Sequence, residues 1–96
     1  MELDFEWDED KAQANLKKHG IAFEDARLVF LDSKRLVRED KRRAYGETRL
    51  QTIGEVSGRM LFVAYTTRAT SIRLISARRA SFEETEEYYG RSDKQA

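Results

Sequence analysis

The stretch TRLQTIGEVSGRMLFVAYTTRATSIRLISAR, residues 48–78, decides the fold. Apolar and polar side chains alternate along it with a period of two, which is typical of strands that bury one face. Consecutive strands joined by tight turns predict an antiparallel meander. The expected strands are Thr48–Val56, Arg59–Thr66 and Ser71–Arg78, with turns at Ser57-Gly58 and Arg68–Thr70.

The chain before this stretch predicts a strand and then a helix. The alternation in LDFEW, residues 3–7, indicates a strand with one buried face. Asp8 can cap a helix, and Gly20 can end one, so a helix is expected from Asp8 to about His19.

A second helix and a fourth meander strand follow. The helix is expected over Phe23–Leu31, with Phe23, Ala26 and Phe30 as its apolar stripe. It lacks a good capping side chain, because Ala22 stands at its start. Leu36–Glu39 is expected to form a short strand ahead of the three longer ones.

The C-terminal segment predicts a last helix. Ser81 and Glu84 form a capping box, and the helix is expected to run through about Tyr89 and to end at Gly90. The order of elements predicts an α+β domain over residues 1–90, with a frayed tail over residues 91–96. The helices are expected to cover one face of the sheet and to leave the other partly open.

Composition excludes several classes of protein. The 96 residues allow one domain and one core. Cysteine is absent, which removes disulfides, cysteine-based metal sites and a thiol nucleophile. The acidic N-terminus does not resemble a signal peptide, and no apolar run approaches the length that spans a membrane. These features predict a soluble, cytoplasmic protein.

The net charge is zero, but the charges are sorted into blocks. Residues 1–10 carry six acidic and no basic side chains, residues 59–79 carry five arginines and no acid, and residues 83–87 carry four glutamates. Such blocks can present one positive surface suited to nucleic acid. Alternatively, they pair with one another across the fold.

Three separated segments resemble the BrnT toxin family. They are FEWDEDKAQANLKKHGIAFEDA near the start, GRMLFVAYTTR in the middle and IRLISARRASFEETEEYY near the end. The resemblance implies a RelE-like fold, ribonuclease activity that stops translation, and a complex with a BrnA-type antitoxin that has a ribbon-helix-helix DNA-binding part. It also implies that the complex represses its own operon, so that operator DNA is bound only through the antitoxin. The segment Lys34–Tyr45 follows no family pattern, and we assign it no role.

The residue types favour RNA cleavage without a metal ion or other cofactor. The sequence has one histidine, no carboxylate pair at ligand spacing beside it and no glycine-rich phosphate loop. In metal-free cleavage, the ribose 2′-hydroxyl attacks the adjacent phosphorus and the 5′-oxygen leaves. The reaction needs a base, an acid and cations that stabilise the developing charge. Because arginines are abundant and good bases are few, electrostatic stabilisation is expected to dominate.

Arg78 is the first candidate for that role. It ends the last expected strand, in a segment that matches the family motif, and a strand end at an open sheet surface can hold a phosphate. The structural alternative is a salt bridge to Glu83, Glu84 or Glu87 of the following helix. Arg79 is expected on the opposite face, at the antitoxin surface, against RNA or in solvent.

The other candidates have structural alternatives of equal or greater weight. Arg59, Tyr65 and His19 are candidate catalytic residues, but a turn-flanking surface arginine, a core tyrosine and a helix-end histidine are the safer interpretations. Candidate RNA contacts are Lys11, Lys18 and Trp7; a core role is favoured for the tryptophan. Lys11, Asn15, Lys18 and His19 are expected to share one arc of the first helix.

A non-catalytic module that binds RNA or a partner protein on its open sheet is the alternative function.

Overall fold

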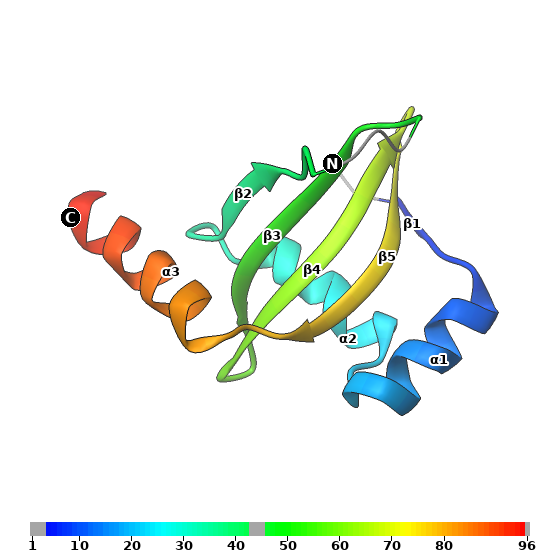
Figure 1. Cartoon of the computed structure of the whole chain (residues 1–96), viewed down its shortest axis with the longest axis horizontal. Coiled ribbons are helices and arrows are strands. Elements are labelled where there is room, and N and C mark those ends of the chain that lie inside the picture. The colour runs from blue at the N-terminus through cyan, green and yellow to red at the C-terminus, as the bar shows by residue number, and fades with distance from the viewer. Residues whose placement is uncertain (1–3, 43–45, 96) are drawn as a thin grey trace.

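The computed structural model describes residues 4–42 and 46–95, with side chains through residue 90 (Figure 1). It confirms the α+β class: a five-stranded sheet is combined with helices on both of its faces. The elements in chain order are β1 (Asp4–Glu6), α1 (Glu9–His19), α2 (Phe23–Ala26), the 3₁₀-helix η1 (Arg27–Leu31), β2 (Leu36–Glu39), β3 (Arg49–Val56), β4 (Arg59–Arg68), β5 (Ser71–Arg79) and α3 (Phe82–Gln95).

The sheet has the strand order β1-β5-β4-β3-β2. Strands β2 to β5 pair antiparallel in sequence order, which confirms the expected meander. The turn between β3 and β4 is formed by Ser57 and Gly58, whose φ angles of 50° and 81° suit a tight hairpin. Strand β4 runs to Arg68, two residues further than expected, so the second turn lies at Ala69 and Thr70. Strand β1 pairs parallel with β5 at the edge of the sheet.

The larger core lies between the sheet and the first two helices. Apolar side chains of β3, β4 and β5 pack against α1, α2 and η1, and in Figure 1 α2 passes behind the sheet. The core residues that are fully buried include Phe23, Val29, Leu61, Val63 and Ala77. We call this side of the sheet the covered face.

Helix α1 has the predicted boundaries. The Asp8 carboxylate accepts a hydrogen bond from the Lys11 N–H at 3.0 Å, and Gly20 adopts a left-handed conformation with φ of 72°. Asn15 is buried, and its side chain bonds to the backbone of Ala77 in β5. The expected arc of α1 is therefore wrong at this position, because Asn15 faces the sheet while Lys11 and Lys18 are exposed.

The expected second helix is divided into α2 and η1. Ala22 provides no side-chain cap, as its methyl group cannot accept a hydrogen bond. Phe23, Ala26 and Val29 are all fully buried, and a spacing of three residues aligns side chains in a 3₁₀-helix rather than in an α-helix. Val29 therefore belongs to the buried stripe together with Phe23, Ala26 and Phe30, whereas the α-helical prediction named the other three and left Val29 out.

Helix α3 covers part of the second face, which corrects the expectation that all helices lie on one side. Tyr88 packs in a smaller core with Leu36, Ile53 and Phe62. The predicted end at Gly90 is wrong, because this glycine does not take a positive φ and the helix continues to Gln95. We call the rest of this second side the open face.

Some predictions lie outside the described residues. Leu3 of the expected first strand and residues 43–45 of the unassigned segment belong to this group. Strand β1 ends at Glu6, one residue before Trp7. The single domain over residues 1–90 stays a prediction. Within the described part of the chain, no helix is both long and apolar enough to cross a membrane.

Candidate nucleic-acid interface

The register of the sheet gathers arginines on the open face. One row across the strands consists of Leu36, Ile53, Phe62 and Arg78, and the next consists of Arg38, Gln51, Ala64 and Ser76. Paired residues point to the same side of a sheet, so Arg78 and Arg38 share the face that carries Phe62. A third row adds two more arginines to this face: Arg49, Thr66, Arg73 and Glu6.

A β-bulge in β5 makes this arrangement possible. Tyr65 pairs with Leu74, whereas Ala64 pairs with Ser76, so Ile75 is the extra residue. Residues five positions apart lie on opposite faces of a regular strand, but the bulge places Arg73 and Arg78 on one face.

Arg78 is held in place by three kinds of contact. Its Nη1 and Nη2 atoms bond to the two carboxylate oxygens of Glu84 at 2.8 and 2.9 Å, and Nη1 also bonds to the Arg79 carbonyl at 3.1 Å. The guanidinium carbon lies 4.0 Å from the centre of the Phe62 ring, a cation–π distance. Its side chain is still 38% exposed, so the guanidinium is fixed but accessible.

Glu84 forms the expected capping box of α3 and also orients Arg78. Its carboxylate accepts the Ser81 N–H at 2.8 Å, while its own N–H donates to the Ser81 hydroxyl oxygen at 3.1 Å. The hydrogen bonds from Arg78 lower the pKa of Glu84; burial opposes this effect without overcoming it. A carboxylate with a lowered pKa is a weak proton acceptor, so an orienting role suits Glu84 better than that of a general base.

A groove of about 310 Å³ lies over this part of the open face. Within it, Arg38 donates from Nε to the Gln51 side-chain oxygen and from Nη1 to Glu87 of α3, both at 3.0 Å. The groove is lined by Arg38, Glu39, Asp40, Lys41, Arg42, Gln51, Phe62, Arg78 and Glu84. Both cationic and acidic side chains thus line one hollow.

Part of the charge in the sequence blocks is paired across the fold. Glu6 of the acidic N-terminal block lies 3.4 Å from Arg73 and 3.9 Å from Arg68. The C-terminal glutamates pair with Arg78 and Arg38. The alternative interpretation of the charge blocks is therefore confirmed for these pairs, including the salt bridge predicted between Arg78 and the last helix.

The structure does not bring the four candidate catalytic residues together. Tyr65 is buried in the larger core, where its ring meets Phe30 edge-on at 4.9 Å and where burial raises its pKa. Arg59 pairs with Val56 at the hairpin end and lies two residues from Leu61 in β4, so all three share the covered face. His19 lies in the last turn of α1 and does not line the groove. Only Arg78 does.

The candidate RNA contacts are also separated from the groove. Arg79 is exposed on the covered side of β5, opposite in direction to Arg78, as its register with Leu61 requires. Lys11 and Lys18 are exposed on α1. Trp7 is half-buried against the larger core, and its ring meets Phe23 edge-on at 5.9 Å, which supports the core interpretation.

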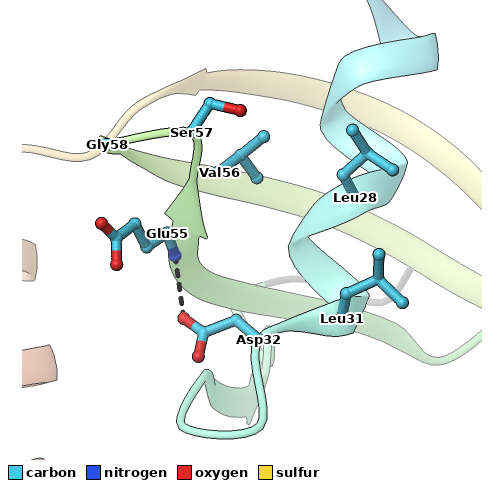
Figure 2. A pocket seen from close by; sticks show the side chains of 7 residues that line it. All are labelled: Leu28, Leu31, Asp32, Glu55, Val56, Ser57 and Gly58. Atoms are coloured by element: carbon cyan, nitrogen blue, oxygen red, sulfur yellow. Dashed lines mark hydrogen bonds between the residues drawn. The ribbon is translucent and has the colours of Figure 1, made fainter.

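A second hollow lies beside η1 and the β3–β4 hairpin, and its lining is apolar and acidic (Figure 2). Leu28, Leu31 and Val56 face it, together with the carboxylates of Asp32 and Glu55. None of the described residues that line it is basic. Because phosphates are repelled by carboxylates, the arginine groove is the better candidate for an RNA site.

The Asp32 carboxylate links the turn after η1 to β3 and to α3. Burial works against its charged form, but hydrogen bonds from the Glu55 N–H, the Tyr88 hydroxyl and the Lys34 N–H outweigh burial and lower the pKa of Asp32. Burial and the hydrogen bond to Asp32 together raise the pKa of Tyr88. The Tyr88–Asp32 distance is 2.7 Å, so α3 is anchored here as well as at Arg78 and Arg38.

Sequence reasoning missed Arg38 and Gln51 and misplaced Asn15. The first two become neighbours only through the pairing of β2 with β3, and nothing in their local sequence marks them. Asn15 carried a signal that could have been used, since a polar residue adjoining the apolar side of a helix needs a hydrogen-bond partner.

The described residues hold no group of three or more histidine, cysteine, aspartate or glutamate side chains that could bind a metal ion. The site is thus an arginine groove on an open sheet in a small α+β protein. A family model described as ribonuclease toxin, BrnT, of type II toxin–antitoxin system matches residues 7–84, and the chain belongs to this family. A comparison with curated proteins finds no match.

Proposed function

We propose that the chain is a metal-independent endoribonuclease that cleaves RNA and thereby stops translation, with Arg78 as the catalytic residue that stabilises charge on the reacting phosphate. The family supports the ribonuclease class and implies an antitoxin partner. The observation that carries the assignment to Arg78 is its fixed but accessible guanidinium on the open face.

The donors of Arg78 that remain available suit a phosphate. Glu84 occupies Nη1 and Nη2, and no other side chain bonds to this guanidinium among the residues that the structure describes. Nε and the outer N–H of Nη2 therefore form a second fork, which matches two phosphate oxygens. Arg78 can hold a phosphate in this fork while Glu84 fixes its plane, which requires little reorganisation during the reaction.

In the proposed reaction, the 2′-hydroxyl oxygen forms a bond to phosphorus as the bond to the 5′-oxygen breaks. Negative charge accumulates on the non-bridging oxygens, where Arg78 donates hydrogen bonds. Solvent takes up the proton of the 2′-hydroxyl and supplies one to the 5′-oxygen, so the products are a cyclic 2′,3′-phosphate and a free 5′-hydroxyl. Tyr65 is outside this proposal because its ring is in the core on the covered face.

The partner and setting are proposed from the family. A BrnA-type antitoxin with a ribbon-helix-helix DNA-binding part neutralises the toxin, and the complex represses its own operon. The fold is proposed to be RelE-like, and the site of action is the cytoplasm, where RNA is translated.

The decisive experiment measures cleavage of RNA by the purified protein and by Arg78→Ala and Arg78→Lys. Loss of one donor to the transition-state charge typically costs about 10²–10³ in rate. Arg78→Lys is expected to be largely inactive as well, because lysine keeps the charge but loses the planar fork. Arg79→Ala is the matched control, because the side chain of Arg79 points to the opposite face of the sheet from that of Arg78. This variant should retain activity.

A folded Arg78→Ala protein that cleaves RNA at the normal rate would remove this residue from the mechanism. RNA that is bound by the normal protein but stays intact would favour a non-catalytic binding module instead.

A further inference from the structure

Arg38 gives the groove a second arginine that the proposed reaction does not use. It lies on β2, one row away from Arg78 across the sheet, and both side chains line the same hollow. Both are also paired with carboxylates from one helix: Glu84 faces Arg78 and Glu87 faces Arg38. These glutamates are three residues apart, so they lie on the same side of α3.

Two different residues contact the guanidinium of Arg38: Gln51 anchors it from within the sheet, and Glu87 covers it from α3. Gln51 is only 9% exposed, and its side-chain oxygen holds Nε of Arg38 from within the sheet. Glu87 contacts Nη1, and the side chains of this ion pair are 44% and 50% exposed. No further bond to Nη2 of Arg38 is found in the described part of the chain.

We propose that Arg38 and Arg78 form a two-point phosphate clamp, in which Arg38 binds a phosphate that flanks the scissile one, and that Glu87 occupies this position in the free protein. The proposal rests on the proposed function for the identity of the ligand as single-stranded RNA. Arg38 acts here as a binding and positioning residue, and Arg78 alone contacts the reacting phosphate.

Energetics favour the exchange of Glu87 for a phosphate. An exposed ion pair contributes little to stability, so the Arg38–Glu87 contact is easily broken. Gln51 stays in place during the exchange, so the guanidinium does not lose its orientation. A backbone phosphate carries the same single charge as a carboxylate, but its two non-bridging oxygens can accept from both Nη1 and Nη2 of Arg38, whereas Glu87 accepts from Nη1 alone. Glu84 differs from Glu87, because its carboxylate is 12% exposed and makes a bidentate contact, so it is expected to remain on Arg78.

The exchange of Glu87 for a phosphate predicts opposite effects on RNA binding for substitutions of Arg38 and of Glu87. Removing the charge of Glu87 frees Arg38 and should tighten RNA binding, whereas removing Arg38 should weaken it. A purely structural salt bridge predicts no such opposition. Glu86→Gln is the matched control, because it makes the same change of charge on an exposed residue of the same helix that has no ion pair in the described structure.

The experiment uses the full chain and a short 2′-O-methyl oligoribonucleotide, which lacks the nucleophile and stays intact. Its Kd is measured by fluorescence anisotropy over a range of salt concentrations. We expect Arg38→Gln to raise the Kd by about tenfold and to reduce the slope of log K against log salt by about one. Glu87→Gln should lower the Kd by about three- to tenfold, with Glu86→Gln closer to the unchanged protein.

An unchanged Kd and salt slope for Arg38→Gln would overturn the clamp, as would equal effects of Glu87→Gln and Glu86→Gln. If Arg38→Gln does not fold, the comparison of the two glutamate variants still decides. Cleavage of unmodified RNA separates the two proposals. If the protein cleaves RNA but its Kd does not depend on Arg38, the clamp alone is overturned. If RNA binding depends on Arg38 but the RNA stays intact, the proposed function alone is overturned. Absence of any RNA binding overturns both.

Discussion

The side chain of Asn15 in α1 takes the place of a neighbouring strand along the edge of β5 at Ala77. Its Nδ2 donates to the Ala77 carbonyl at 2.9 Å, and its Oδ1 accepts the Ala77 N–H at 3.0 Å. Strand β1 covers β5 only over residues 71–73, so the backbone next to Arg78 would otherwise have no partner on this side. Nδ2 also donates to the Ile21 carbonyl at 2.9 Å, which fixes the chain after α1.

Replacing Asn15 by alanine should therefore destabilise the protein strongly. Three buried backbone groups lose their partner, and each such group costs about 1–3 kcal/mol, so a loss of at least about 3 kcal/mol is expected in urea unfolding. Gln13→Ala, on the exposed side of the same helix, should change the free energy of unfolding by less than about 0.5 kcal/mol. Equal stability of the two variants would contradict the bridging role of Asn15.

A second test concerns the close contact between β3 and η1. A Cβ atom on Gly54 would lie 2.8 Å from Cγ2 of Val29, which is fully buried and cannot move freely. Gly54→Ala should destabilise the protein by about 1–3 kcal/mol through overpacking. Gly90→Ala is the control, because its Cβ would meet nothing within 4 Å and alanine favours the helix. It should stabilise by up to about 1 kcal/mol. A harmless Gly54→Ala would show that the two elements separate easily.

Acid should loosen α3 before other parts of the fold. The hydrogen bonds from Arg78 lower the pKa of Glu84, and those at Asp32 outweigh burial to lower its pKa from the ordinary value of 3.8. Groups with lowered pKa values bind more protons in the unfolded state, so stability rises with pH. Their contribution is complete above the ordinary carboxyl values and is lost as the pH falls through the lowered ones.

The free energy of unfolding should therefore decline below about pH 4, and Glu84→Gln should flatten this decline. Amide hydrogen exchange followed residue by residue reports the opening of α3 separately from the rest of the fold. An identical decline in Glu84→Gln would assign the acid sensitivity to other carboxylates.

Chelation tests the chemistry of the groove. We expect RNA cleavage to persist in excess EDTA, because charge stabilisation is assigned to arginine. The measurement compares cleavage rates with and without EDTA, with added Mg²⁺ as a further arm. Loss of activity in EDTA that a divalent ion restores would defeat the metal-free mechanism.

The sequence predicted the strands well because each is governed by local alternation. The four meander strands and the opposite directions of Arg78 and Arg79 follow from a period of two, and the strand order follows from the short turns between consecutive strands. A period of two could not predict the bulge at Ile75, because the extra residue is recognised only from the pairing of β5 with β4. For the same reason, the shared face of Arg73 and Arg78 could not be predicted.

The site was predictable only where one residue sufficed. Arg78 and its ion-pair partner Glu84 are only six residues apart in the sequence, and the capping box predicted the position of Glu84 at the start of α3. Arg38 and Gln51 are 13 residues apart and meet through strand register. His19 and Arg59 have suitable chemistry but lie away from the groove, and side-chain chemistry alone gives no information on placement.

The pairing of β1 with β5 also affects how the protein is made. Strand β1 can pair only after Ser71–Arg73 of β5 has been synthesised. Asn15 likewise needs Ala77, which lies 62 positions later in the chain. Contacts of such long sequence separation form slowly, because a large loop has to close before any of them is gained. A chain still being translated therefore holds its N-terminal strand and helix without their partners. Under the proposed function, the protein would become competent to cut RNA only after synthesis has passed Glu84, the partner of Arg78.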